Sequence, residues 1–475
     1  MKRLLPLGLQ DFARIRKRGF CYVDKTARIH ELITGSAEVC FLSRPRRFGK
    51  SLLCSTLWAI FAGKRELFGE FAGRGALAID SLEWEWKKHP VIWLDLSPEN
   101  YTEDAGVLDS LLHNSLDNIA ADHGLQANGE TVAQKFANLI KDMRNRFGEE
   151  VVVIVDEYDA PLLGTINQPE IHEQLREKLK GFYGVLKANG AYLRFVFLTG
   201  VTKFSHVSIF SNLNNLADLT LDPKYADICG LTEEEVFENY EPEIAGILAA
   251  SGKSRAEYVG ELRRFYNGYR FTKKQLKVYN PFGLLHHLHS GGDFQSYWYD
   301  TGTPTFLIKL IREQKINILD LNSLQVELTD FQRYDIKDMM AEPILYQSGY
   351  LTIADFDEKA QMYSLDYPNE EVRSCFARSL LDHFMADSGV TPGGLNIKLA
   401  NALHKGDIDG AMAILRQFLA AIPYDIVRES ENYYQTAVFL IFKMLGFDCR
   451  AEVRIAAGRI DTLVEMPDYI YCFEF

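Results

Sequence analysis

The stretch Ser43-Arg44-Pro45-Arg46-Arg47-Phe48-Gly49-Lys50-Ser51-Leu52 decides the fold class expected of this 475-residue chain. It follows the apolar run Val39 to Leu42, which has the length and composition of a buried strand. Four apolar residues with a helical period come directly after it: Leu53, Leu57, Ile60 and Phe61. A Gly-Lys-Ser tripeptide between a strand and a helix is typical of a loop whose backbone N–H groups bind phosphate. The stretch therefore predicts a phosphate-binding loop.

The residue types in this loop suit a polyphosphate. Lys50 is expected to reach the β and γ phosphates, and Ser51 to hold Mg²⁺. Arg44 stands where the usual pattern has its first glycine, which leaves a strict loop geometry open at this point. The alternative, a basic helix N-terminus without a ligand, is disfavoured by the helix macrodipole. We therefore assign nucleotide binding to the whole loop: Arg44, Pro45, Arg46, Arg47, Phe48, Gly49, Lys50, Ser51 and Leu52.

Three further apolar runs resemble the first: Val91 to Leu96, Val151 to Val155, and Phe195 to Leu198. None alternates with polar residues, as expected for strands that are buried on both faces. Segments of helical length separate the runs, so the sequence predicts an α/β fold with a largely parallel sheet. Ligands bind at the carboxyl ends of such strands. The polar residues that follow the four runs delimit a candidate site: Ser43, Ser97, Asp156 and Thr199.

Asp156 and Glu157 follow a run of valine and isoleucine. An aspartate at the end of a buried strand can organise Mg²⁺, and the adjacent glutamate can polarise the attacking water. Alone, two acids after an apolar run are more often solvated loop residues; with Gly49-Lys50-Ser51 upstream they predict ATP hydrolysis. Thr199 could contact the γ phosphate or the lytic water if its strand lies between the other two. The alternative is a capped turn before Gly200.

The composition is that of a globular protein. Lys and Arg number 52, Asp and Glu number 65, the net charge is −13, and 47% of the residues are apolar. This acidity argues weakly against indiscriminate binding of nucleic acid. No apolar run approaches the roughly 18 residues of a spanning helix and no export signal is visible, so we expect no membrane partner. Seven scattered cysteines without a CxxC pair fit a cytoplasmic protein better than a disulfide or zinc framework.

The sequence predicts three units along the chain. Residues 1–230 carry the strands and the loop described above. Residues 231–425 are expected to form a mainly helical middle region, since Glu-rich helical segments alternate there with aromatic turns. Residues 426–475 predict one amphipathic helix followed by two strands.

Three carboxylates in the last unit suggest a second metal site. Glu431 lies seven residues before Val438, at almost the same helical angle as the apolar stripe, so its carboxylate needs a partner. Asp461 and Glu474 lie equally far from the centre of a hairpin at Pro467-Asp468, which predicts that they are directly opposed. Glu431, Asp461 and Glu474 then form a candidate Mg²⁺ site for phosphodiester hydrolysis. The alternative is an edge hairpin with solvated acids.

The motifs resemble those of the prokaryotic AAA-ATPase-like family along essentially the whole chain. Several segments join the quoted loop in this resemblance: Leu7 to Phe12, Tyr22 to Thr26, Asp156 to Asp159, Thr199 to Ser205, Phe265 to Tyr269, Val278 to Pro281 and Gln347 to Leu351. The resemblance implies a P-loop ATPase, with Arg44 as a residue typical of the family, followed by a PD-(D/E)xK nuclease-superfamily domain. Asp461 and Glu474 then resemble the Asp and Glu-x-Lys motifs of that superfamily. The lysine expected after Phe475 is absent, so we expect a truncated, incomplete nuclease-like α/β domain.

Taken together, the sequence predicts an ATP-binding, ATP-hydrolysing enzyme coupled to a Mg²⁺-dependent nuclease-like domain. ATP and Mg²⁺ are the expected cofactors, and DNA or RNA is the expected partner of the C-terminal domain; the oligomeric state stays open. The alternative is an ATP-dependent conformational switch or scaffold with a degenerate nuclease domain. A purely structural helical scaffold is disfavoured, because nothing structural requires Lys50, Ser51, Asp156 and Glu157 in this arrangement.

Overall fold

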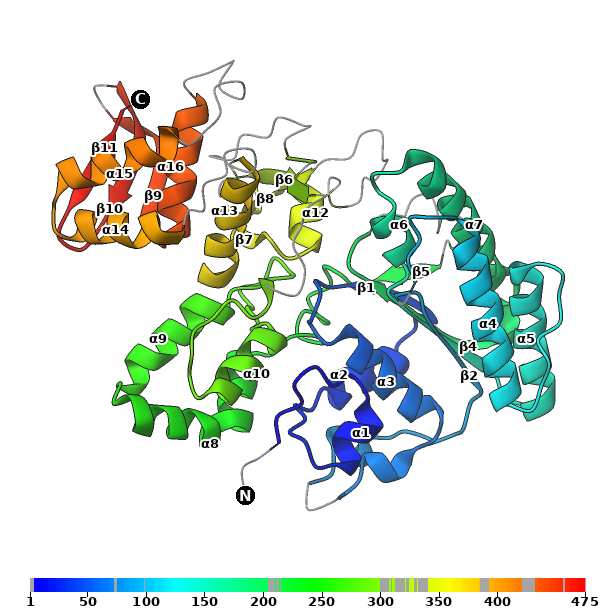
Figure 1. Ribbon diagram of the computed structural model, residues 1–475. Coiled ribbons are helices and arrows are strands. Elements are labelled where there is room, and N and C mark those ends of the chain that lie inside the picture. Colours follow the sequence, from blue (N-terminus) through cyan, green and yellow to red (C-terminus); the bar gives the residue numbers. More distant parts are fainter. Residues whose placement is uncertain are drawn as a thin grey trace.

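A computed structural model describes residues 4–474, apart from residues 72–74, 98, 204–209, 211–212, 214, 300–306, 309, 312–320, 322–323, 329–330, 332–340, 385–392, 421–431 and 456–457. Figure 1 shows an N-terminal sheet at one side of the molecule and the C-terminal strands at the opposite side. The middle segment of the chain lies between them.

The N-terminal part is built on a five-stranded parallel sheet with the strand order β2-β3-β4-β1-β5. The strands are β1 (Val39–Ser43), β2 (Val91–Asp95), β3 (Val151–Asp156), β4 (Leu193–Gly200) and β5 (Leu216–Asp218). The four predicted runs are strands β1 to β4, and the predicted α/β class is confirmed. Strand β5 was not predicted, because a three-residue edge strand is too short to leave a pattern.

Both faces of this sheet are buried, and alternate residues of each strand fill two separate cores. In β3, Val152 and Ile154 belong to one core, whereas Val151, Val153 and Val155 belong to the other. Successive side chains of a strand point to opposite faces, so a sheet covered on both sides needs an apolar residue at every position. This is the physical reason why the four runs do not alternate.

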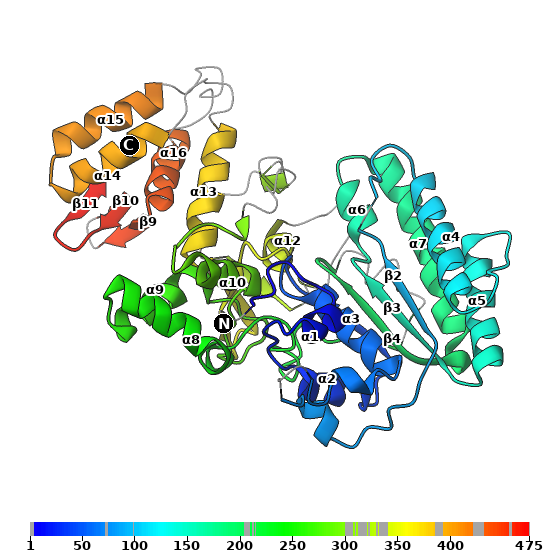
Figure 2. The ribbon, with the colours of Figure 1, turned by 60° about the horizontal axis from the view of Figure 1, so that its bottom comes forward.

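Helices cover the two faces of the sheet, as Figure 2 shows from a second direction. One face carries α1 (Phe12–Lys17), α2 (Thr26–Ile33) and α3 (Lys50–Phe61), with short 3-10 turns η1 (Arg65–Leu67) and η2 (Ala78–Ser81). The other face carries α4 (Gly106–Asp122), α5 (Val132–Phe147), α6 (Ala160–Gly164) and α7 (Pro169–Ala188), followed by the 3-10 turn η3 (Gly190–Tyr192). The result is a three-layer α/β unit.

The two ends of α5 show how the local sequence determines where these helices begin and end. The Oγ1 atom of Thr131 accepts a hydrogen bond from the backbone N–H of Gln134, which caps the first turn. Gly148 ends the helix with a φ of 72°, in the left-handed region that glycine adopts most easily. Between these caps, Phe136 and Leu139 belong to the stripe that is buried against the sheet.

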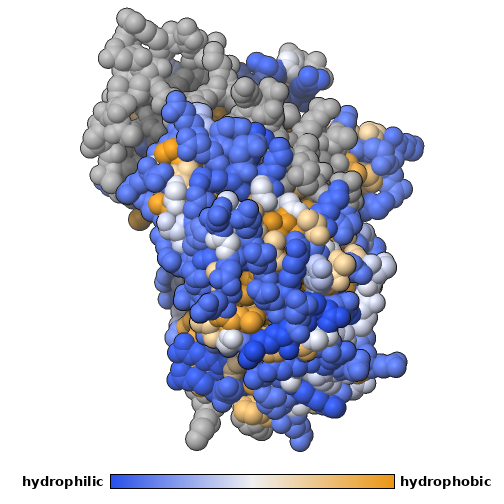
Figure 3. Space-filling model, turned by 90° about the vertical axis from the view of Figure 1, so that its right-hand side faces the viewer, coloured by the Kyte–Doolittle hydropathy of each residue, from blue (hydrophilic) through white to orange (hydrophobic). Residues whose placement is uncertain are grey.

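The outer face over α4, α5 and α7 is mostly hydrophilic, with scattered apolar side chains (Figure 3). Among the described residues, no helix combines the length and the apolar character needed to cross a bilayer.

The middle segment is mainly helical, as predicted, but it also contains a small antiparallel sheet with the strand order β6-β8-β7. Its helices are α8 (Glu233–Ser251), α9 (Arg255–Tyr266), α10 (Pro281–Ser290), α12 (Ala341–Gln347) and α13 (Glu370–Phe384). Its strands are β6 (Gln325–Glu327), β7 (Thr352–Asp357) and β8 (Met362–Asp366). Thr232 and Ser254 begin α8 and α9 with capping boxes.

The C-terminal body packs helices against a second antiparallel sheet with the order β11-β10-β9. Its elements are α14 (Gly393–His404), α15 (Ile408–Ala420), α16 (Asn432–Met444), β9 (Asp448–Ile455), β10 (Gly458–Glu465) and β11 (Ile470–Phe473). The predicted amphipathic helix is α16, and the predicted hairpin is β10 and β11. Strand β9 was not predicted, because its charged residues interrupt the alternation of apolar residues. Helix α16 also packs against α13, which connects this body to the middle segment.

Candidate functional site

The loop between β1 and α3 has a backbone suited to anions. Gly49, directly before α3, has a φ of 93°, and Arg47 has a φ of 65°. Both values lie in the left-handed region, which glycine adopts freely and arginine rarely. Mixed right- and left-handed residues turn successive N–H groups into a concave anion site. The backbone therefore supports the prediction of a phosphate-binding loop.

A cavity of about 530 Å³ lies at the carboxyl ends of the central strands. This volume falls within the range of about 300–1,000 Å³ that is usual for small-molecule sites. One part of its lining is basic and another part is acidic. The basic residues are Arg46, Arg47 and Lys50, and the acidic ones are Asp95, Glu99 and Glu157. Such a cavity can hold a polyanion together with the cation that neutralises it.

Lys50 begins α3, and its side chain is only 3% exposed. Its Nζ atom donates to the carbonyl oxygens of Arg44 at 3.2 Å and Pro45 at 3.3 Å. The same atom lies 3.2 Å from Oε1 of Glu157, the residue that follows β3. The structure therefore brings together one residue from each of the two predicted motifs.

Asp156 ends β3 and is 2% exposed. The pKa of Asp156 is raised to about 6: burial is the largest cause, the nearby charge of Glu157 also raises the pKa, and a hydrogen bond from the Ser51 side chain opposes them. A carboxylate and a hydroxyl side by side supply the hard oxygen ligands that Mg²⁺ prefers. Ser51 and Asp156 thus fit the predicted metal, and Lys50 with the loop backbone fits the predicted phosphates.

Strand β4 lies between β3 and β1, which meets the condition stated for Thr199. The Thr199 hydroxyl is fully buried and donates to the carbonyl oxygen of Leu42 at 2.7 Å. Its only hydrogen is therefore used between two strands and is not available to a phosphate oxygen in this arrangement, whereas its lone pairs can still accept a hydrogen bond from a water molecule.

The side chain of Arg44 corrects one expectation. Instead of adding charge to the phosphate site, its guanidinium is 1% exposed and donates to the carbonyl oxygens of Ser43, Thr220 and Tyr225 at 2.8–3.0 Å. It also lies 4.3 Å from the centre of the Phe271 ring. Burial lowers the pKa of Arg44. The arginine in place of the loop's first glycine therefore anchors the loop to the chain that follows β5.

The other loop residues divide between two sides. Arg46 and Arg47 line the polar cavity, and the Arg47 guanidinium lies 5.0 Å from the centre of the Phe282 ring. Phe48 is buried, with its ring centre 4.7 Å from that of Tyr269. Leu52 is half-buried on α3.

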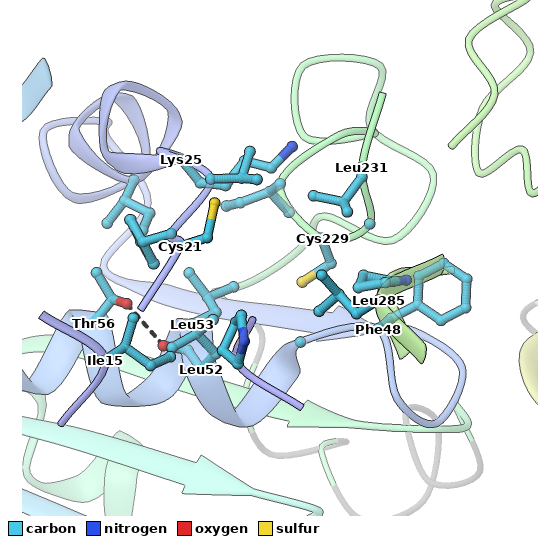
Figure 4. A pocket seen from close by; sticks show the side chains of 18 of the residues that line it. Ile15, Cys21, Lys25, Phe48, Leu52, Leu53, Thr56, Cys229, Leu231 and Leu285 are labelled. Atoms are coloured by element: carbon cyan, nitrogen blue, oxygen red, sulfur yellow. Dashed lines mark hydrogen bonds between the residues drawn. The ribbon is translucent and has the colours of Figure 1, made fainter. Parts of the chain in front are cut away.

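A second pocket of about 100 Å³ shares Gly49 with the polar cavity (Figure 4). Its lining is mainly apolar and comes from three parts of the chain, including Cys21, Lys25, Phe48, Leu52, Leu53, Cys229, Leu231 and Leu285. Lys25 is paired with Glu235 of α8 at 2.6 Å, so its charge is already balanced. An apolar pocket next to a phosphate-binding loop suits the flat base of a nucleotide.

Asp159 is a site residue to which sequence analysis gave no role, although it stands in the Asp156 to Asp159 motif. It is fully buried, and its Oδ2 atom accepts from the Thr202 backbone N–H at 2.7 Å and from Thr202 Oγ1 at 2.6 Å. Burial raises the pKa of Asp159 to about 6. Asp95 was also missed, although an acid near the end of the run Val91 to Leu96 was a visible signal.

The hairpin has the predicted register as far as its ladder extends, with Thr462 paired with Phe473. Asp461 and Glu474 are the next residues on the two sides, beyond the paired ladder, so their opposition stays a prediction. Glu431 lies outside the described residues. Within the described ranges, no three His, Cys, Asp or Glu side chains gather closely enough to hold a metal ion.

Gln435 and Glu452 are further residues near Asp461. The Nε2 atom of Gln435 donates to the carbonyl oxygen of Asp461 and to Oε1 of Glu452, both at 2.8 Å. Glu452 has a φ of 56° inside β9, an unusual conformation for a non-glycine residue in a strand. No sequence pattern could show this conformation.

The parallel sheet, the Gly-Lys-Ser loop after β1 and the Asp-Glu pair at β3 define a P-loop type of α/β protein. Residues 6–210 match the family model described as predicted AAA-ATPase, and residues 429–475 match that of the PD-(D/E)XK nuclease superfamily. The sequence is 35% identical over 483 residues to an uncharacterized protein in the vnfD 5′ region of Azotobacter chroococcum mcd 1, covering 100% of this chain and 89% of that protein. The chain belongs to the AAA-ATPase-like family and carries a C-terminal PD-(D/E)XK nuclease-superfamily domain.

Proposed function

We propose that the protein binds Mg²⁺·ATP in the polar cavity and hydrolyses it. The observation that carries this proposal is the meeting of Lys50 with Glu157, and of Ser51 with Asp156, at one edge of the sheet. The two motifs are about a hundred residues apart in the sequence, and the fold alone does not require both pairs to meet at this edge of the sheet.

The two pockets support a binding mode for the nucleotide. The phosphates suit the N–H groups of the loop and the Lys50 ammonium, and the base suits the apolar pocket beyond Gly49. Arg46 and Arg47 add positive charge at the cavity, where they offset the charge of a bound triphosphate. Ser51 and Asp156 would hold Mg²⁺.

In this proposal each side chain has a separate task. Bound Mg²⁺ would neutralise charge that develops on the transferred phosphoryl group. Lys50 exchanges its contact with Glu157 for contacts with the phosphates. Glu157 is then free to accept a proton from, or to orient, the attacking water. Asp159 holds the segment after β4 through Thr202 and so fixes the wall beside Glu157.

We further propose that ATP turnover is coupled to a Mg²⁺-dependent nuclease-like activity of the C-terminal domain on DNA or RNA. Membership of that domain in the PD-(D/E)XK superfamily supports this proposal. Asp461 and Glu474 share the hairpin, and with Glu431 they are the proposed metal ligands. The three-part division at residues 230 and 425 likewise remains a proposal.

A second candidate function is a conformational switch that binds ATP without a working nuclease domain. The contacts between the phosphate-binding loop and the middle segment favour it, because the Trp298 indole N–H donates to the carbonyl oxygen of Arg46 at 2.9 Å. Steady turnover of ATP would distinguish an ATPase from such a switch.

The experiment that tests the proposed function is a calorimetric titration with Mg²⁺·ATP. Lys50→Ala should weaken ATP binding by about tenfold to 100-fold, the effect of losing a hydrogen bond to a charged group. Lys141→Ala, at an exposed position of α5, is the matched control and should bind like the wild type. Equal affinity of Lys50→Ala and the wild type would reject the proposed binding site.

A further inference from the structure

The Gln347 to Leu351 motif lies beside the phosphate-binding loop, although roughly three hundred residues separate them in sequence. Gly349 has a φ of 90°, and a Cβ atom at this position would lie only 2.7 Å from the Cβ of Pro45. A larger residue would therefore push against the loop, which explains why a glycine stands here. The third nearest atom belongs to Trp298, at 3.4 Å.

Trp298 reaches the loop from the same side. Its indole N–H donates to the carbonyl oxygen of Arg46 at 2.9 Å, and its backbone N–H donates to Oε1 of the buried Glu371 at 2.6 Å. In a trans peptide the C=O and the next N–H point in opposite directions. Holding the Arg46 carbonyl toward Trp298 therefore turns the N–H of Arg47 away from Trp298, as a loop that receives an anion from the other side requires.

Gln347 holds a second loop, the one that follows β4. Its Oε1 atom accepts from the backbone N–H of Lys203 at 2.9 Å, and its side chain is almost fully buried. The buried Lys203 ammonium forms an ion pair with the partly exposed Asp218 at the end of β5. Thr202, the preceding residue, is the partner of Asp159, which stands two residues after Glu157. Gln347 is thus linked through this loop to the segment that carries Glu157.

We propose that Trp298, Gln347 and Gly349 form a clamp of positioning residues. The clamp holds the phosphate-binding loop on one side and the loop after β4 on the other, and it makes the middle segment responsive to what occupies the cavity. Its effect on ATP turnover rests on the proposed function, whereas its effect on the two loops does not.

Trp298→Phe tests the first contact, because it removes the indole N–H and keeps an aromatic ring. In the nucleotide-free protein, hydrogen exchange of the backbone amides from Arg46 to Lys50 should become about two- to tenfold faster, the effect of one lost hydrogen bond. The matched control is Trp84→Phe, since the buried Trp84 indole N–H has no hydrogen-bond partner in the described part of the chain. Unchanged exchange in Trp298→Phe would overturn the clamp.

Gln347→Met tests the second contact, because methionine has a similar length and no carbonyl acceptor. We expect kcat for ATP to fall about tenfold or more while KM changes less than about twofold, since a small displacement of catalytic groups is costly. Gln417→Met, at an exposed position of α15, should leave both values unchanged. A change in KM without a fall in kcat, or no change in either value, would contradict this role of Gln347. Faster exchange in Trp298→Phe together with a wild type that does not hydrolyse ATP would support the clamp and reject the proposed function.

Discussion

The Nζ atom of Lys50 lies 3.2 Å from the Oε1 atom of Glu157, and this contact joins the first residue of α3 to the residue after β3. Lys50 is almost completely buried, whereas the Glu157 side chain is 23% exposed. Triphosphate oxygens would compete with Glu157 for the same ammonium. Phosphate binding therefore implies that Glu157 is released toward the cavity, where the proposed mechanism needs it.

Arg44 and Arg46 should behave in opposite ways when their charge is removed. Arg44→Gln leaves several buried carbonyl oxygens without a donor, so we expect the free energy of unfolding to fall by roughly 2–4 kcal/mol. Arg46→Gln removes charge from the cavity, so it should weaken ATP binding and leave stability nearly unchanged. Chemical denaturation and calorimetry of both variants measure the difference. Equal stability of Arg44→Gln and the wild type would contradict the anchoring role of Arg44.

Asp156 should make the folded protein less stable as the pH rises. Burial raises the pKa of Asp156 from 3.8 to about 6, so the folded protein holds this proton more tightly than the unfolded chain. The contribution of Asp156 to the free energy of unfolding is therefore largest below pH 3.8 and is lost as the pH rises through about 6. Asp156→Asn should therefore gain about 1–3 kcal/mol relative to the wild type at pH 8 and lose that gain near pH 4.

Unfolding free energies measured from pH 4 to pH 8 for the two proteins check this prediction. An Asp156→Asn difference that is the same at every pH would show that the carboxylate is not destabilised by its surroundings. The same variant should also lose Mg²⁺-dependent nucleotide binding, since an amide is a poorer ligand than a carboxylate.

The C-terminal hairpin should bind a divalent cation through Asp461. Titration with Mn²⁺ in the absence of nucleotide should detect a site that is lost in Asp461→Ala and retained in Asp468→Ala, whose carboxylate stands in the turn of the hairpin. Plasmid cleavage with Mg²⁺ or Mn²⁺ provides a second readout for both variants. Equal Mn²⁺ binding by Asp461→Ala and the wild type would favour the alternative of solvated acids.

Sequence patterns predicted the parts of the fold that depend on local rules. Strand β3 is recognisable because a strand buried on both faces must be apolar at every position, and the hairpin register follows from the turn and the two-residue period of strands. The three-residue strand β5 and the small sheet of the middle segment lack such a signal.

The sequence also could not predict the direction in which a long side chain points. Arg44 stands in a loop rich in cations, and only the folded positions of Thr220, Tyr225 and Phe271 show that its guanidinium is buried away from the phosphate site. In the same way, the contact of Gln347 with Lys203 joins residues that are far apart in sequence, and no local pattern predicts it.

The most direct test of the account is the rate of phosphate release from Mg²⁺·ATP by the wild type and by Glu157→Gln. Glutamine keeps the size of the side chain but cannot accept a proton, so we expect nucleotide binding to persist while kcat falls by roughly two to four orders of magnitude. The binding of Mg²⁺·ATP by both proteins is measured in the same preparation by calorimetry. Turnover in Glu157→Gln equal to that of the wild type would contradict the central claim that the Glu157 carboxylate, beside Lys50, accepts a proton from or orients the water that attacks ATP.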